Sequence, residues 1–226
     1  MLSALGVWPD GHWEIVHWQI AAGENETTWK TFFGQLYAKG LTEETTKLVV
    51  SDGAQGLESA LEYQFHGVPH QRCVFHKIKP IADHLLYSAL EVDDEARDDQ
   101  ARRKAKATRK RAILADAGVM YTQKTEGAIR AQAEVFRETW QEREPKAVAN
   151  FFTDFDTTLA SLRVDFPASL GSLIRTTNRL ERFHKEMRRK QRDIGMFQSE
   201  AGCEAIWYLL TTRETAKQQA VLGLRA

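Results

Sequence analysis

A strand–helix–strand pattern in residues 47–75 constrains the fold of this chain more than any other feature of its sequence. In KLVVSDGAQGLESAL (47–61), an apolar run stops at Ser51-Asp52, Gly53 turns the chain, and a helical stripe follows. HQRCVF (70–75) then supplies a second short strand. Two strands joined through one helix pair in parallel, with a right-handed crossover. The pattern therefore predicts an α/β fold and places Asp52 at the carboxyl end of a strand, where open α/β sheets bind ligands and metals.

The segments before this unit predict a β-hairpin and a helix. Residues 3–8 and 12–20 flank Pro9-Asp10-Gly11, a turn in which Pro fixes φ and Gly accepts a positive φ. The alternation of apolar and polar residues in the second strand is imperfect. Residues 25–39 predict a helix that Asn25 caps and Gly40 ends. We assign its apolar stripe to the core: Trp29, Phe32, Phe33, Leu36 and Tyr37.

The remainder of the chain carries helical spacing. Between about 77 and 165 we find no strand signal, DFPASLGS (165–172) is a loop, and helices open at Asn178 and near residue 200. The sequence thus predicts a first part of an α/β core (1–90), an all-helical insertion (91–165), and C-terminal helices that complete the core (166–226).

Composition excludes several classes of protein. No apolar run is long enough to span a bilayer, and the first residues lack the features of a signal peptide. Two cysteines, Cys73 and Cys203, make no disulfide framework, which favours a reducing compartment and hence the cytoplasm. A P-loop and the G-x-G-x-x-G and G-x-S-x-G motifs are absent, so nucleotide hydrolysis and serine-hydrolase chemistry have no support.

The charge is balanced overall but segregated along the chain. Net charge is zero, yet DDEARDD (93–99) is acidic and RRKAKATRKR (102–111) is basic, as is RFHKEMRRKQR (182–192). For residues 93–111 we favour a solvated helix face laced with ion pairs over a contact with nucleic acid.

The helix that opens at Asn178 offers a partner for Asp52. Leu180, Phe183, Met187 and Ile194 cluster on one arc that would pack on the sheet, and Glu181, Lys185, Arg188 and Arg192 form a neighbouring stripe. A carboxylate followed by three cations suits a metal ligand beside a phosphate track. Spacing leaves a structural alternative open, in which Asn178 and Glu181 form a capping box and Glu181 pairs with Lys185.

QRCVFHK (71–77) contains a C-x-x-H motif that could be half of a zinc site. A structural zinc needs a second pair of ligands, and Cys203 has no Cys or His close to it in sequence. On a strand, His70 and Cys73 would also point to opposite faces. Zinc is therefore the minor interpretation.

These segments together resemble a known family. SDGAQGLESAL, QRCVFHK and TTNRLERFHKEMRRKQR followed by Phe197 resemble the catalytic core of bacterial Mutator-type insertion-sequence transposases. The hairpin with Gly6 and Asp10-Gly11, Trp29, and Gly40-Leu41 match that family too, so the resemblance covers nearly the whole chain.

The resemblance implies a ribonuclease-H-like fold with an Asp, Asp, Glu triad that binds Mg²⁺ or Mn²⁺. Asp52 matches the second Asp of the triad, and Glu181 matches the Glu. Cys73 and His76 match a C-x-x-H signature near the active site, Asn178 belongs to the motif around the Glu, and the helical stretch matches an insertion before the Glu.

The resemblance also implies that the chain is N-terminally truncated, because the family's first Asp lies on a strand before the hairpin. We therefore expect a DNA transposase core for strand cleavage and transfer that is incomplete and inactive alone. The alternative is a non-catalytic DNA-binding or regulatory remnant. The expected partners are transposon ends, target DNA, and copies of itself or of a full-length transposase, in the bacterial cytoplasm at the nucleoid. The phosphate-binding residues would be Arg182, Lys185, Arg188, Arg189 and Lys190.

Overall fold

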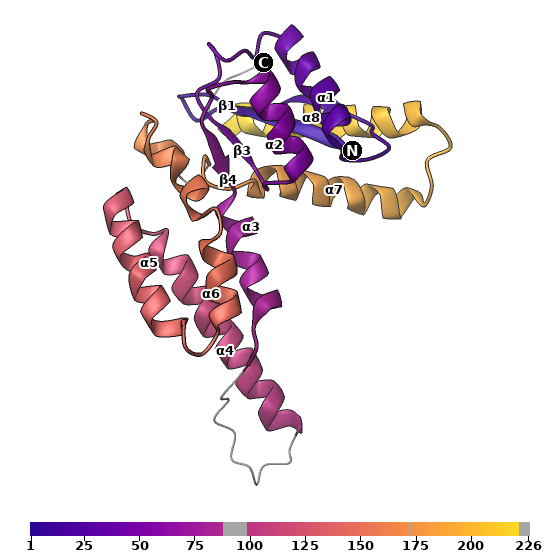
Figure 1. Ribbon diagram of the computed structural model, residues 1–226. Coiled ribbons are helices and arrows are strands. Elements are labelled where there is room, and N and C mark those ends of the chain that lie inside the picture. Colours follow the sequence, from indigo (N-terminus) through magenta and orange to yellow (C-terminus); the bar gives the residue numbers. More distant parts are fainter. Residues whose placement is uncertain (88–98, 172, 222–226) are drawn as a thin grey trace. The chain divides into compact units, whose positions relative to one another are not determined.

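A computed structural model of residues 1–226 describes residues 1–87, 99–171 and 173–221, without the side chains of 218–221 (Figure 1). Most of the acidic run 93–99 lies outside the described residues. The chain divides into two compact units, which we call the core unit (Met1–His70 with Val164–Ala226) and the helical unit (Gln71–Arg163). The predicted domain boundaries after residues 90 and 165 remain predictions.

The core unit begins with the predicted hairpin. β1 (Leu2–Val7) pairs antiparallel with β2 (Trp13–Gln19), and the register shifts so that Ala4 faces His17 while Leu5 faces Ile15. Val16 is therefore an extra residue, a β-bulge, which leaves neighbouring side chains on one face of the strand. The bulge explains the imperfect alternation in the sequence.

One face of the hairpin packs on two helices. α1 (Glu26–Ala38) begins at Asn25, whose Oδ1 accepts a hydrogen bond of 2.9 Å from the Thr28 amide, and Gly40 follows its end at a φ of 91°. α2 (Gln55–Gln64) packs beside it. The predicted placement of Tyr37 in the core is wrong: its side chain is 39% exposed, because it lies at the edge of the stripe. The buried residues of this core are Leu2, Phe32, Phe33, Leu36, Leu57, Ala60, Leu61 and Phe65.

The other face of the hairpin packs on α7 (Asn178–Ile194) and α8 (Glu200–Val221), which follow the 3₁₀ turn η3 (Ala168–Leu170). Ile15 and Trp18 of β2 contact this second cluster, whose buried members are Phe183, Met187, Trp207 and Leu210. Ile194 is 45% exposed, so its predicted place on the buried arc is wrong; it is the last residue of α7. The hairpin is therefore covered by helices on both faces.

β3 (Val49–Ser51) and β4 (His70–Arg72) form a second, parallel pair joined through α2, as predicted. Both strands are shorter than predicted. The sequence extended the second strand to residue 75, but α3 (Val74–Ile78) begins there, with Cys73 as its N-cap. A short apolar run does not distinguish a strand from a buried helix. Burial of Val74 in the helical core favours the helix.

The helical unit contains the predicted helices. After α3 come η1 (Lys79–His84), α4 (Asp99–Met120), α5 (Glu126–Trp140), α6 (Pro145–Phe152) and η2 (Phe155–Leu162). Their shared core has Ile81, Ile113, Met120, Ile129, Phe136, Phe151 and Leu159 among its most buried members. Throughout the described residues, no helix has the combined length and apolar character of a membrane span.

Three buried polar side chains fasten the helical unit. Gln71 is fully buried; its Nε2 donates to the Thr158 carbonyl (2.6 Å) and its Oε1 accepts from the Ser161 amide (2.8 Å). Lys77 donates to the carbonyls of Asn150 and Thr153, at the end of α6. The third, Glu144, holds residues 86–87 and α4.

Glu144 is fully buried, and its carboxylate accepts from three residues. It accepts from the backbone amides of Leu86 (2.6 Å) and Tyr87 (3.1 Å) and from Nη1 of Arg109 (3.3 Å). A buried charge is tolerated only when it is paired and hydrogen-bonded in this way.

Candidate active site

Glu181 lies in the first turn of α7, where its charge is favoured by the positive end of the helix dipole. The N-cap is Thr177, whose hydroxyl donates to Glu181 Oε1 at 2.9 Å. The capping box that spacing allowed at Asn178 does not form, because Asn178 is already the first helical residue. Glu181 is therefore held by Thr177 and is only half-buried.

Asp52 follows the last residue of β3, as predicted, and its side chain is exposed. Its Oδ1 accepts a bond of 3.3 Å from the Ala54 amide, and Gly53 turns the chain at a φ of 83°. Ser51 supports the turn, since its Oγ accepts from the Gly53 amide and bonds Nε2 of His70 at 2.7 Å. Asp52 and Glu181 belong to the same core unit, and their convergence on one metal site remains a prediction.

Cys73 is the N-cap of α3 and His76 lies in the first turn of that helix, so neither belongs to a strand. Cys73 is fully buried, His76 is half-buried, and the Cys73 Sγ lies within 4.8 Å of a ring nitrogen of His76. Both belong to the helical unit. Their predicted position beside the carboxylates, and the absence of zinc from them, remain predictions.

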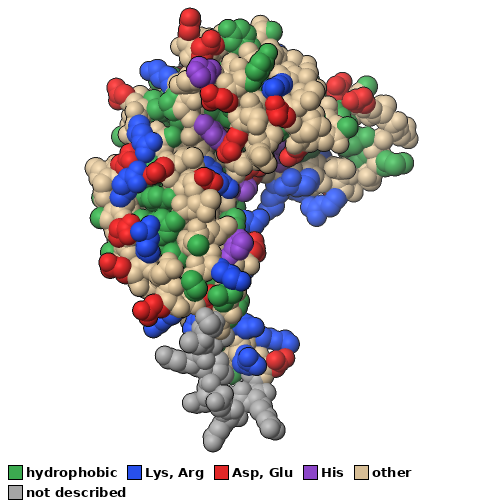
Figure 2. Space-filling model, in the orientation of Figure 1, with side chains coloured by type: hydrophobic (Ala, Val, Ile, Leu, Met, Phe, Trp, Pro, Cys, Tyr) green, Lys and Arg blue, Asp and Glu red, His purple; other side chains and the backbone are tan. Residues whose placement is uncertain are grey.

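The outward face of α7 is basic. Arg182, Lys185, Arg188 and Arg189 are exposed and Lys190 is half-exposed, while Phe183 and Met187 are buried on the opposite face. Figure 2 shows Lys and Arg side chains gathered over this helix. Glu186 pairs with Arg189 at 3.1 Å and reduces the positive charge there. The face combines one acid near its start with cations along its length.

Two contacts that sequence reasoning missed join α7 to the hairpin. Ser3 Oγ of β1 bonds His184 Nε2 at 2.6 Å, and the guanidinium of Arg179 lies over the Trp13 ring at 5.1 Å from its centroid. Burial, and then Arg182, lowers the pKa of Arg179. The one sequence signal that could have identified His184 is its position next to Phe183 and one turn after Leu180, on the apolar arc of the helix. These contacts fix the rotation of α7 and thereby the direction in which Glu181 points.

We expect the core unit to lose stability as pH falls below about 6.5. Burial, together with Arg188 and the terminal amine, lowers the pKa of His184 from its usual 6.5. The unfolded chain then binds a proton that the folded chain does not, so stability is present above pH 6.5 and declines below it, by at most about 1.4 kcal/mol per pH unit for one proton.

Urea unfolding between pH 5 and 7.5 measures this effect. His184→Gln keeps a hydrogen-bonding group near Ser3 and should flatten the profile. His66→Gln, at a histidine whose side chain is 84% exposed, is the control. Equal pH profiles for the His184→Gln variant and the unsubstituted protein would contradict the prediction.

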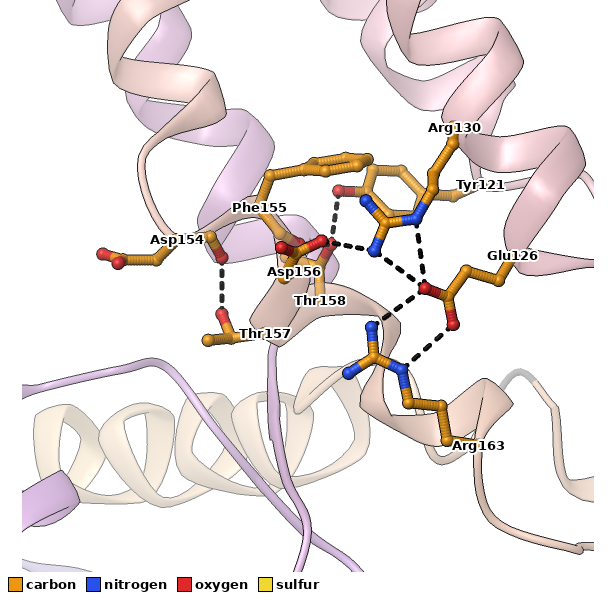
Figure 3. Close-up of polar contacts among 9 residues, drawn as sticks. All are labelled: Tyr121, Glu126, Arg130, Asp154, Phe155, Asp156, Thr157, Thr158 and Arg163. Carbon is orange, nitrogen blue, oxygen red and sulfur yellow. Dashed lines mark hydrogen bonds and ion pairs between the residues drawn. The ribbon is translucent and has the colours of Figure 1, made fainter.

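A second charged cluster lies in the helical unit (Figure 3). Glu126 accepts from Arg130 (2.8 Å) and Arg163 (2.9 Å), and Arg130 also pairs with Asp156 (2.5 Å). Arg163 and Arg130 lower the pKa of Glu126 to about 2. Arg130 and Asp156 line a groove of about 690 Å³. Because these charges satisfy one another, we interpret the cluster as a fastening of α5 to η2.

Known proteins are similar to this chain over nearly its whole length. The model of a family described as Transposase, Mutator family, matches residues 1–95 and 99–219. The transposase for insertion sequence element IS406 of Burkholderia multivorans is 30% identical over 203 residues, which cover 90% of this chain and 46% of the relative. The transposase for IS905 of Lactococcus lactis is 26% identical over 93% of this chain and 47% of its own length.

A shorter match is more similar. The transposase for IS256 in transposon Tn4001 of Staphylococcus aureus is 44% identical over 78 residues, 34% of this chain and 20% of the relative. The chain thus spans about half the length, or less, of these curated relatives.

Proposed function

Because this chain belongs to the Mutator family of transposases, we propose that it contributes to metal-dependent cleavage and joining of DNA strands. The observation that supports this proposal best is α7. It presents Glu181 in its first turn and exposed cations beyond it, while Phe183 and Met187 anchor its opposite face.

The carboxylates of Asp52 and Glu181 are suitable ligands for a hard divalent cation, because Mg²⁺ and Mn²⁺ prefer oxygen ligands. Asp52 would bridge the ions and Glu181 would hold one of them. When bound, such ions activate the attacking oxygen and stabilise the leaving oxygen in phosphoryl transfer. The residues proposed to hold the DNA backbone are Arg182, Lys185, Arg188, Arg189 and Lys190.

We further propose that the core unit is ribonuclease-H-like. Helices on both faces of the hairpin and a parallel strand pair support this fold. A site for two ions needs several carboxylates to hold them at a fixed separation. Since Asp52 and Glu181 are the two that we identify, we expect this chain alone to bind DNA without cutting it. A DNA substrate would place it at the bacterial nucleoid.

Metal binding tests the proposed carboxylates directly. We expect Mn²⁺ binding, measured by electron paramagnetic resonance, to weaken roughly tenfold or more in Asp52→Asn and in Glu181→Gln. Asp10→Asn is the matched control, because Asp10 lies in the hairpin turn and accepts from the His12 amide at 2.9 Å. Equal losses in all three variants would sink the assignment.

Incubating the chain with Mg²⁺ and DNA separates the catalytic and non-catalytic alternatives. We expect binding without nicking. Metal-dependent nicking that Asp52→Asn abolishes would show that this chain is catalytically complete. Mixing it with a full-length relative tests the regulatory alternative, in which the chain would lower the relative's activity.

A further inference from the structure

We propose that the N-terminal half of α4 is a second binding surface for the DNA phosphate backbone, formed by the helical unit. The inference rests on the proposed function for the identity of the ligand. It is independent of the carboxylates and of α7.

This half of α4 is a helical arm that contributes no buried side chain to the core and joins the helical unit through Arg109, which pairs with Glu144. The buried residues of α4 are Ile113, Ala117 and Met120, all in its C-terminal half, and no side chain from Asp99 to Ala112 is buried. In Figure 1 this end of α4 runs beyond the ends of α5 and α6. Ala, Arg and Lys are strong helix formers, so the arm, which continues the packed C-terminal half of α4, keeps its helical shape with little tertiary packing of its own.

The arm is also strongly charged, and the described residues neutralise few of its charges. Its six exposed cations are Arg102, Arg103, Lys104, Lys106, Lys110 and Arg111. In the part of the chain that the structure describes, an acid pairs with one of them, Asp99 with Arg103 at 3.0 Å, and both of those side chains are at least 80% exposed. Lys106 also lies over the ring of Tyr87, 5.3 Å from its centroid.

The described residues favour a second interpretation of the basic run, while the acidic residues 93–98 lie outside them. A polar helix that buries few of its side chains is usually stabilised by many i,i+4 ion pairs, and the sequence favoured that explanation. The described residues contain one such pair in the arm, Asp99–Arg103. A large uncompensated positive surface is instead typical of a phosphate-binding element.

The spacing of the cations suits a nucleic-acid strand. Arg102, Lys106 and Lys110 are four residues apart, so they form one line with steps of about 6 Å and a length of about 12 Å. One strand of DNA presents a phosphate about every 3.4 Å of helix axis, or three to four over that length. We therefore expect the arm to bind backbone phosphates without preference for base sequence.

The experiment is a salt titration of DNA binding by the full chain. The probe is a fluorescein-labelled duplex of about 25 base pairs and arbitrary sequence, followed by anisotropy across a KCl series. The arm variant is Arg102→Gln, Lys106→Gln, Lys110→Gln, since Gln keeps helix propensity. The control, Lys47→Gln, Lys124→Gln, Lys146→Gln, removes the same charge from exposed sites outside the arm.

We expect the arm variant to bind roughly tenfold or more weakly near 0.1 M salt, and the slope of log K against log salt to fall by up to about 2.7. The control should change the slope little. Circular dichroism establishes that both variants keep their helix content.

An arm variant that behaves like the control overturns the inference. In that case a third variant, Arg182→Gln, Lys185→Gln, Arg188→Gln, shows whether α7 still accounts for binding, which leaves the proposed function standing. If the unsubstituted chain binds anionic vesicles but not the duplex, the arm is not a DNA contact. The Mn²⁺ binding measurement then tests the proposed metal ligands Asp52 and Glu181 independently of DNA binding.

Discussion

Glu144→Gln is expected to destabilise the helical unit by roughly 3–5 kcal/mol, the usual cost of breaking a buried ion pair from one side. The substitution removes the negative charge that Arg109 contacts at 3.3 Å. It also turns an amide donor toward the Leu86 and Tyr87 amides, which donate to the carboxylate at 2.6 and 3.1 Å. Such a loss approaches the whole stability of a small domain. Hydrogen exchange of α4 and α6 measures it without interference from the core unit.

Glu142→Gln is the matched control, because Glu142 is two positions away and exposed. It should change stability by no more than about 0.5 kcal/mol. If exchange in the helical unit is equally fast in both variants, Glu144 is not the fastening that we describe. Loss of the helical unit should also remove the DNA affinity that we assign to the arm of α4.

Gln71→Leu should cost about 2–4 kcal/mol, because it removes the partners of two buried backbone groups and leaves them unsatisfied. The groups are the Thr158 carbonyl and the Ser161 amide, which Gln71 bonds at 2.6 and 2.8 Å. Leu has a similar volume, so the loss reports hydrogen bonds more than a cavity.

Gln141→Leu, at an exposed position of the same unit, is its control. Urea unfolding followed by hydrogen exchange in η2 checks the result. If Gln71→Leu raises stability instead, the apolar contacts of Leu outweigh the lost bonds, and Gln71 is not required to hold η2.

The elements that the sequence predicted well are those with local signals. Asn25 marks the start of α1 and Gly40 lies just after its end, as predicted. Pro9-Asp10-Gly11 forms the turn between β1 and β2. The bulge at Val16 shows in the sequence as an imperfect alternation that does not give its position, because the position depends on which residues of β1 face β2. The helix at Cys73 was missed for a similar reason: Val74 gains its burial from a core assembled by α4, α5 and α6.

The same contrast applies to the site. The place of Glu181 in the first turn of α7 and of Asp52 after β3 follows from local pattern. Glu144 and Gln71 gave no signal, because their partners are 57 and 87 positions away in sequence. His184 likewise bonds a residue 181 positions away. Long-range polar pairs of this kind require the fold to be known first.

The buried amide of Gln71 has a consequence for how this protein could be re-engineered. It ties the first residue of the helical unit to Thr158 and Ser161, near its last residue, so the two ends of a long segment meet. A segment whose two ends lie close together connects to the rest of the chain as a short loop does. The entropy cost of closing such a segment grows only slowly as residues are added to it. Loops between the helices of this segment can therefore be lengthened at small cost, provided that Gln71, η2 and the core on which η2 packs are retained.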